Sequence, residues 1–116
     1  MFNFVLLIGR TVSDVKVNTL DNGIKVANMT LAVNRSFKNA ETGEYDVDFV
    51  TVVLWQGIAE NVSKHVKKGS TVAVKGRVAV RSNEVNGIKI NVMDIIGERV
   101  TFINLKNEST EISGEE

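Results

Sequence analysis

The chain has 116 residues, 14 Lys and Arg against 14 Asp and Glu, and no cysteine. This length fits one domain with a single core, and the lack of cysteine excludes a disulfide framework, a thiolate zinc site and a cysteine nucleophile. The longest wholly apolar run, Phe4–Ile8, is far shorter than the ~20 residues of a membrane span, and its flanks lack the features of a signal peptide.

Alternation of apolar and polar residues predicts strands in the first half of the chain, at Phe2–Arg10, Ile24–Arg35 and Val47–Trp55. The second has one apolar face, formed by Ala27, Met29, Leu31 and Val33. The third is apolar on both faces, so we expect it to be central or to lend its second face to an interface. Asp21-Asn22-Gly23 predicts a turn before the second strand.

A helix is predicted over Gly57–Lys68. There Ile58, Val62 and Val66 are spaced four residues apart and fall on one helical face. Lysines gather toward the end of the segment, where they suit the helix dipole, and Gly69 is a plausible C-terminal cap.

Three more strands are expected at Thr71–Arg81, Ile88–Ile95 and Val100–Leu105, with a tight turn at Asn86-Gly87. Short strands with one helix between the third and fourth favour an all-β fold, a five-stranded Greek-key barrel of the OB type. Pattern alone leaves open a swapped or open sandwich. We expect residues 1–106 to form this domain. Residues 107–116 hold four Glu and no basic residue, and they are expected to be a flexible acidic tail.

The sequence offers little support for an enzyme. His65 is the only histidine, so no two-histidine metal site exists, and we expect it to be a solvated helix residue. Asp46 and Asp48 are two residues apart and could form a carboxylate pair, but a solvated strand edge is the simpler interpretation. No phosphate-binding glycine motif occurs. We therefore expect no catalysis, no metal and no cofactor.

Basic residues are unevenly distributed. Residues 61–83 contain no acid and six cations. Within Thr71–Arg81, valines at 72, 74, 78 and 80 alternate with Lys75, Arg77 and Arg81, which predicts one core face and one cationic face. A solvated face is the simpler interpretation of charge, but charges of a single sign favour a phosphate track.

Aromatic side chains can stack on unpaired bases. Phe37 lies between the basic residues Arg35 and Lys38, where a core role is hard to arrange. Phe49 and Trp55 share one face of the third strand, which predicts either core residues or a stacking platform. Phe2, Phe4 and Phe102 are typical of a core or an interface.

Several of these segments resemble the bacterial single-stranded DNA-binding proteins. The resemblance is carried by VLLIGR at 5–10, ANMTLAVNRSF at 27–37, DFVTVVLW at 48–55, AEN at 59–61, KGS at 68–70, GR at 76–77 and RS at 81–82. It runs from about Met1 to Leu105 in the order and spacing of that family. No single motif is diagnostic, but together they are specific.

The resemblance implies an OB fold, usually a homotetramer, that wraps and protects single-stranded DNA without sequence preference in replication, recombination or repair. It also implies a cytoplasmic, nucleoid-associated protein that does not contact membranes. The expected nucleic-acid-binding residues are Arg10, Arg35, Phe37, Lys38, Phe49, Trp55, Lys68, Lys75, Arg77 and Arg81.

The sequence departs from the family pattern in three places. Asn83 stands where an aromatic is common, and Val15 and Asn18-Thr19 replace a proline and an Arg-Tyr pair. Residues 1–116 hold no counterpart of the usual acidic tail tip ending in Pro-Phe, and they contain no proline. We therefore do not expect replication or repair partners to be recruited through such a tip.

Two other functions compete with DNA binding. One is a replisome-assembly or protein-interaction subunit that uses exposed Val50 and Val52 and has incidental DNA affinity. The other is a small hydrolase that uses Asp46 and Asp48. The neutral total charge combines 14 bases and 10 acids in residues 1–106, or +4, with four acids in residues 107–116, or −4. We expect the acidic segment to compete weakly with DNA, so that its deletion tightens binding at low salt.

Overall fold

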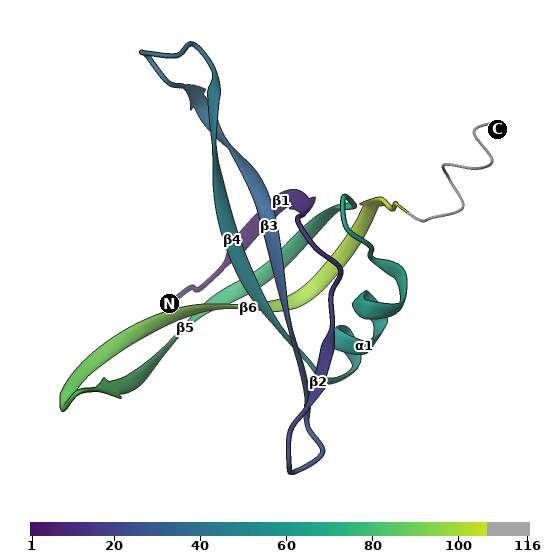
Figure 1. Ribbon diagram of the computed structural model, residues 1–116, viewed down its shortest axis with the longest axis vertical. Coiled ribbons are helices and arrows are strands. Elements are labelled where there is room, and N and C mark those ends of the chain that lie inside the picture. The colour runs from purple at the N-terminus through teal and green to yellow at the C-terminus, as the bar shows by residue number, and fades with distance from the viewer. Residues whose placement is uncertain (107–116) are drawn as a thin grey trace.

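The computed structural model describes residues 1–106. Six strands and one helix follow one another in this range (Figure 1). They are β1 (Val5–Thr11), β2 (Val17–Thr19), β3 (Lys25–Lys38), β4 (Tyr45–Trp55), α1 (Gln56–His65), β5 (Thr71–Val85) and β6 (Ile88–Asn104).

The sheet closes on itself. Its strand order is β1-β5-β6-β4-β3-β2, and β1 also pairs with β3. The neighbours in this ring are antiparallel except β4 and β6, which run parallel. The five long strands therefore form a closed barrel, to which the short β2 adds beside β3. With α1 between β4 and β5, this is the predicted OB-type barrel, and the open sandwich is wrong.

Every second side chain along the strands points into the barrel, and these side chains fill its interior. Met29 and Leu31 of β3 and Val52 and Leu54 of β4 are at most 1% exposed. Valines 72 and 74 complete the core from β5, and α1 packs Ala59 and Val62 against it, followed by Val66. Burying a side chain of this size contributes about 1.5–3 kcal/mol.

Three hairpins project from the barrel (Figure 1). We call residues 35–48 the β3–β4 arm and residues 80–93 the β5–β6 arm; the third is the β2–β3 turn. The radius of gyration, 16.6 Å, exceeds the ~13 Å of a compact domain of about 100 residues. Both predicted turns are confirmed: Gly23 has φ +86°, and Asn86 and Gly87 have φ of 52° and 78°, as a two-residue hairpin loop requires.

Some predicted boundaries were wrong. Ile88–Ile95 and Val100–Leu105 are one continuous strand, β6, which passes through a register shift instead of a loop. The helix ends at His65, so Lys68 lies in the following turn, where Gly69 adopts φ +88°. The expected face of valines in β5 is core only at its start, because Val80, on the β5–β6 arm, is 66% exposed.

No helix in residues 1–106 combines the length and apolar character needed to cross a membrane.

Candidate nucleic-acid interface

An aromatic strip runs along the outer face of β4. It consists of Phe49, Thr51, Val53 and Trp55, whose side chains alternate with the core residues Val52 and Leu54. Phe49 is 69% exposed and Trp55 is 40% exposed. Of the two interpretations left open by the sequence, the outward platform is therefore the one that the fold adopts.

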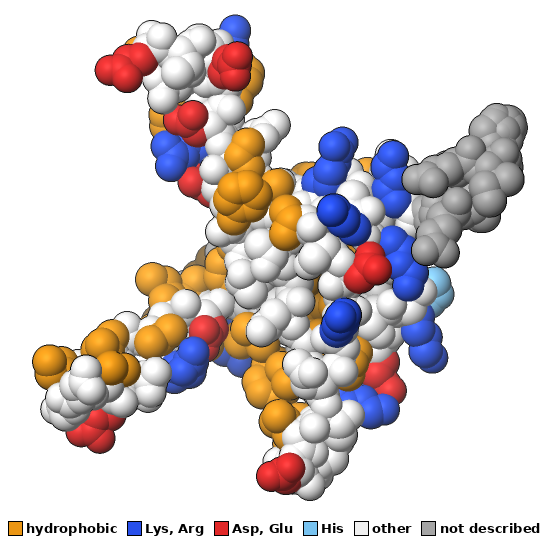
Figure 2. Space-filling view, in the orientation of Figure 1, with side chains coloured by type: hydrophobic (Ala, Val, Ile, Leu, Met, Phe, Trp, Pro, Cys, Tyr) orange, Lys and Arg blue, Asp and Glu red, His pale blue; other side chains and the backbone are white. Residues whose placement is uncertain are grey.

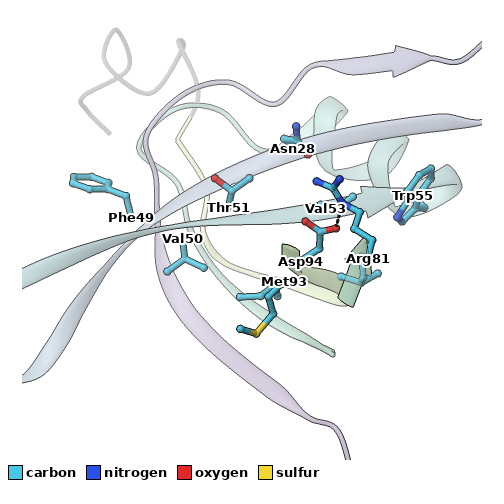
Figure 3. A pocket seen from close by; sticks show the side chains of 11 residues that line it. Asn28, Phe49, Val50, Thr51, Val53, Trp55, Arg81, Met93 and Asp94 are labelled. Carbon is cyan, nitrogen blue, oxygen red and sulfur yellow. Dashed lines mark hydrogen bonds and ion pairs between the residues drawn. The ribbon is translucent and has the colours of Figure 1, made fainter. Parts of the chain in front are cut away.

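The aromatic strip lines a groove of about 690 Å³ (Figure 3). Phe49 and Trp55 lie toward opposite ends of the labelled part of β4, with Thr51 and Val53 between them. β4 also contributes Val50, and the other walls come from β3, β5 and β6, through Asn28, Arg81, Met93, Asp94, Ile95 and Ile96. The groove thus combines ring faces, which bases can stack on, with polar groups.

A second hollow, of about 440 Å³, lies on the side of β3 that faces β1. It is lined by Ile8, Gly9, Arg10, Ala32, Asn34 and Thr71. In the register of the sheet, Ala32 pairs with Arg10 on one side and with Phe49 on the other. Directly paired residues share a face, so the Arg10 guanidinium and the Phe49 ring flank a small alanine on the outer surface.

The β3–β4 arm carries three more predicted residues. Phe37 is 64% exposed, as its basic surroundings suggested. The Lys38 ammonium lies 5.8 Å from the centre of the Tyr45 ring, a cation–π distance. The Arg35 side chain instead lies against Asp48, to which its Nε donates at 3.2 Å and its terminal nitrogen at 3.0 Å.

Asp46 and Asp48 both form ion pairs with Arg35 and are not arranged as a catalytic pair. The second Arg35 terminal nitrogen lies 3.8 Å from Asp46 Oδ2. Both oxygens of the Asp48 carboxylate accept hydrogen bonds from the Arg35 guanidinium, and this contact holds the pKa of Asp48 below its ordinary value. The hydrolase hypothesis loses the feature that suggested it.

The three cations of β5 have acidic partners on β6. The Lys75 ammonium lies 3.7 Å from Glu98 Oε1, and the Arg77 Nε lies 3.4 Å from Glu98 Oε2. Arg81 Nε donates to Asp94 Oδ2 at 2.7 Å (Figure 3). The single sign of charge along Thr71–Arg81 is therefore a property of that segment alone, since β6 supplies carboxylates that are distant in sequence.

Arg10 and Lys68 have no carboxylate within ion-pair distance among residues 1–106. The Lys68 side chain is exposed in the turn after α1, and its backbone N–H donates to Asp14 Oδ1 at 2.7 Å. Figure 2 shows Lys and Arg side chains gathered over the side of the barrel that carries α1. A cationic surface thus exists, but it lies partly away from the aromatic strip.

Several residues that line the groove were not predicted from the sequence as site residues. Asn28 lines the groove and Thr30 lies beside it in β3; both alternate with the buried residues of β3, and this alternation places them on the face opposite the core. The Thr30 and Thr51 hydroxyls lie 3.0 Å apart, across the two strands. Met93 and Asp94 could not be assigned, because they enter the groove through the β4–β6 pairing, which is non-local and parallel.

An apolar surface covers the outer face of β1. Phe4, Leu6 and Ile8 are 46%, 59% and 55% exposed, and Phe2 stacks on Phe4 with 5.7 Å between ring centres. Phe2 and Phe4 are therefore not core residues, whereas Phe102 packs against the core. The protein-interaction hypothesis placed its surface at Val50 and Val52; this is wrong for Val52, which has no exposed surface.

Residues 2–103 of this chain match the model of the "Single-strand binding protein family". Single-stranded DNA-binding protein B of Bacillus subtilis (strain 168) is 43% identical over 107 residues, which cover 91% of this chain and 94% of that protein. The single-stranded DNA-binding protein of Halalkalibacterium halodurans is 40% identical over 112 residues, covering 96% of this chain and 66% of that protein. A structure titled "Plasmodium falciparum SSB complex with ssDNA" superposes with a TM-score of 0.74 at 26% identity, covering 90% of this chain and 96% of that one.

Proposed function

This chain belongs to the single-strand binding protein family, and we propose that it binds single-stranded DNA without sequence preference and without catalysis. The observation that carries the proposal is the exposed aromatic strip of β4 in its groove. Ring faces on an outer sheet surface accept any base, because every base has a π-face. The similarity to a structure solved with single-stranded DNA supports the same conclusion.

In this proposal bases stack on Trp55, Phe49 and Phe37, and phosphates lie along the predicted cations. We propose that Arg10 holds the phosphate of a base stacked on Phe49; the register, in which only Ala32 lies between the two, supports this. The other proposed phosphate ligands are Arg35, Lys38, Lys68, Lys75, Arg77 and Arg81. Each phosphate neutralised lowers the log–log slope of affinity against salt by about 0.7.

The direct test is a titration with thymidine oligomers followed by tryptophan fluorescence, because Trp55 is the single tryptophan. We expect quenching at low salt, weaker binding as salt rises, and similar affinity for oligomers of different sequence. Duplex DNA of the same length is the control and should bind much less well. An unchanged signal at low salt, with no complex on a native gel, would contradict the proposal.

We further propose that the protein assembles as a homotetramer in the cytoplasm and wraps single-stranded DNA during replication, recombination or repair. The exposed apolar face of β1 supports the assembly, since monomers rarely leave a contiguous apolar patch of this kind open to water. A multimer would also present several aromatic strips to one strand, which raises overall affinity without any new contact.

A further inference from the structure

We propose that Asp94 acts as a positioning residue for DNA binding: it fixes the Arg81 guanidinium in the groove by one nitrogen, so that the two terminal nitrogens can bind a phosphate. The inference rests on the proposed function, and it gives Asp94 a role opposite to the repulsion expected of an acid at a DNA-binding surface. We call Arg81 and Asp94 the groove pair.

The groove pair comprises the charged side chains among the residues 1–106 that line the groove. Arg81 Nε donates to Asp94 Oδ2 at 2.7 Å, and Figure 3 shows the Arg81 side chain pointing toward the β4 side of the groove, where Val53 lies. Because one positive and one negative charge cancel, net charge does not attract phosphate to this lining. A phosphate has to be bound here by the geometry of the guanidinium.

The contact within the groove pair leaves most of the guanidinium available. An arginine has five N–H donors, of which only one is on Nε. Asp94 takes that one, and no hydrogen bond or ion pair in the part of the chain that the structure describes involves the terminal nitrogens of Arg81. Arg35 differs, because its Nε and one terminal nitrogen donate to Asp48 and its other terminal nitrogen lies 3.8 Å from Asp46 Oδ2. Asp94 and a phosphate can therefore bind Arg81 at the same time, on different nitrogens, and the planar fork of terminal nitrogens suits phosphate.

The register of β5 and β6 brings the groove pair together. Arg81 pairs with Val92, and Asp94 pairs with Ala79, so Arg81 and Asp94 are diagonal neighbours on one face of the two strands. Asp94 directly precedes the segment of β6 that pairs with β4, whereas Arg81 belongs to the projecting β5–β6 arm. The Asp94 side chain is 23% exposed and that of Arg81 is 58% exposed. A carboxylate at the barrel wall thus holds a guanidinium that would otherwise move with the arm.

The groove pair lies apart from the apolar face of β1. Strand β1 pairs with β5 along Thr71–Gly76, and Arg81 lies beyond that segment. It lines the groove together with Phe49 and Trp55. Assembly through the β1 face therefore does not require the groove pair to be covered, and DNA in the groove can contact it.

Positioning by Asp94 lowers the entropic cost of binding. A long arginine side chain loses rotamer freedom when one geometry is imposed on it. The groove pair imposes that geometry during folding, so phosphate meets a guanidinium that is already ordered. The Asp94 carboxylate repels phosphate only weakly, because its charge is compensated by the Nε contact of Arg81.

The test titrates Asp94→Ala and the wild type with thymidine oligomers over a range of salt. We expect Asp94→Ala to bind roughly 3- to 10-fold more weakly, as loss of one orienting hydrogen bond implies, although removal of an acid would by charge alone tighten binding. Asp94→Asn keeps an oxygen that can accept from Arg81 Nε, so its affinity should lie closer to that of the wild type. Glu84→Gln is the matched control. It also removes one negative charge, but on the opposite face of the β5–β6 arm, where no ion pair involves Glu84 among the described residues, and it should not weaken binding.

A double-mutant cycle separates positioning from competition. Arg81→Ala should weaken binding roughly 10-fold in the wild type, as loss of one charge-assisted contact implies, and it should reduce the steepness of the log–log salt slope by about 0.7. In the Asp94→Ala background both effects of Arg81→Ala should be much smaller, because the guanidinium is no longer held in place.

Tighter binding by Asp94→Ala, with a larger effect of Arg81→Ala in that background, would show that Asp94 competes with phosphate and would overturn the inference. Equal effects of Arg81→Ala in the two backgrounds would also overturn it, and in both cases DNA binding itself would stand. A wild type that fails to bind would overturn the proposed function and this inference together. Thermal melting of each variant identifies loss of folding, and Asp94→Asn, which keeps the size and polarity of the side chain, carries the comparison if Asp94→Ala does not fold.

Discussion

Phe49 and Val52 belong to one short stretch of β4, yet the first is 69% exposed and the second has no exposed surface. The difference arises because successive side chains of a strand point to opposite faces, so odd-numbered and even-numbered positions of β4 lie on different sides of the sheet. Sequence could predict that Phe49, Thr51, Val53 and Trp55 share a face. It could not predict which face is outside, because the other face of β4 is equally apolar and only closure of the barrel distinguishes them.

Replacing Phe49 by Ala should weaken binding of thymidine oligomers by about 1–3 kcal/mol, or roughly 5- to 150-fold, through loss of one stacked base. The melting temperature should stay close to that of the wild type, since the ring contributes little to the core. Ile88→Ala, which truncates an apolar side chain that is 65% exposed at the tip of the β5–β6 arm and outside the groove, is the control and should bind normally. Equal loss of affinity in both variants would count against a specific stacking site at Phe49.

The Arg35–Asp48 pair makes stability depend on pH in a defined direction. Because the hydrogen bond from Arg35 and its charge lower the pKa of folded Asp48 below its unfolded value, the pair stabilises the protein fully above the unfolded value, near pH 4. The contribution disappears as the pH falls through the folded value. Asp48→Asn should therefore melt below the wild type at pH 6, and the difference should vanish in strong acid.

Thermal melts between pH 2 and pH 7 measure this convergence. Asp21→Asn serves as the control, since no ion pair involves Asp21 among residues 1–106, and its difference from the wild type should not follow the same curve. A difference for Asp48→Asn that persists unchanged at pH 2 would show that the pair does not titrate as described.

At the scale of elements, strands with clear alternation were predictable and irregular ones were not. The sequence predicted two strands, Ile88–Ile95 and Val100–Leu105, with Gly97-Glu98-Arg99 between them. In the structure this intervening segment is a bulge, and the strand continues through it because its partner β5 continues on the other side. Similarly, the lysines after His65 extended the predicted helix, but Val66 returns to extended backbone so that its side chain can enter the core.

The bulge leads to a prediction about stability. Gly76→Ala should destabilise the fold by about 1–3 kcal/mol, because the new Cβ would meet the carbonyl oxygen of Ile96, a rigid backbone group. Gly57→Ala is a matched control in α1, where no atom lies within 4 Å of the added Cβ, and it should be neutral or stabilising by up to about 1 kcal/mol. Denaturant unfolding of both variants measures the contrast, and equal stability would contradict the close approach of β5 and β6.

For the molecule as a whole, net charge is a poor guide to partners. The zero total conceals a charge of +4 in residues 1–106, and within that range ion pairs with neighbouring strands reduce the charge available to DNA. Residues 107–116, which carry the four compensating acids, lie outside the described residues. Charge arithmetic could therefore separate a basic barrel from an acidic segment, but it could not identify Arg10 and Lys68 as cations without acidic partners in residues 1–106, because that depends on strand pairing.

At the scale of the whole molecule, we expect the outer face of β1 to control assembly. Leu6→Lys places a charge in the middle of the apolar face formed with Phe4 and Ile8, where a partner chain would have to bury it at a high cost in free energy. We expect sedimentation velocity to show smaller species for Leu6→Lys than for the wild type. Leu20→Lys is the matched control, since Leu20 is 42% exposed at the β2–β3 turn, and it should leave the assembly unchanged. Because the aromatic strip lies on β4, dissociated Leu6→Lys should still quench with short oligomers but should lose affinity for long ones. A Leu6→Lys protein that sediments like the wild type would place the interface elsewhere.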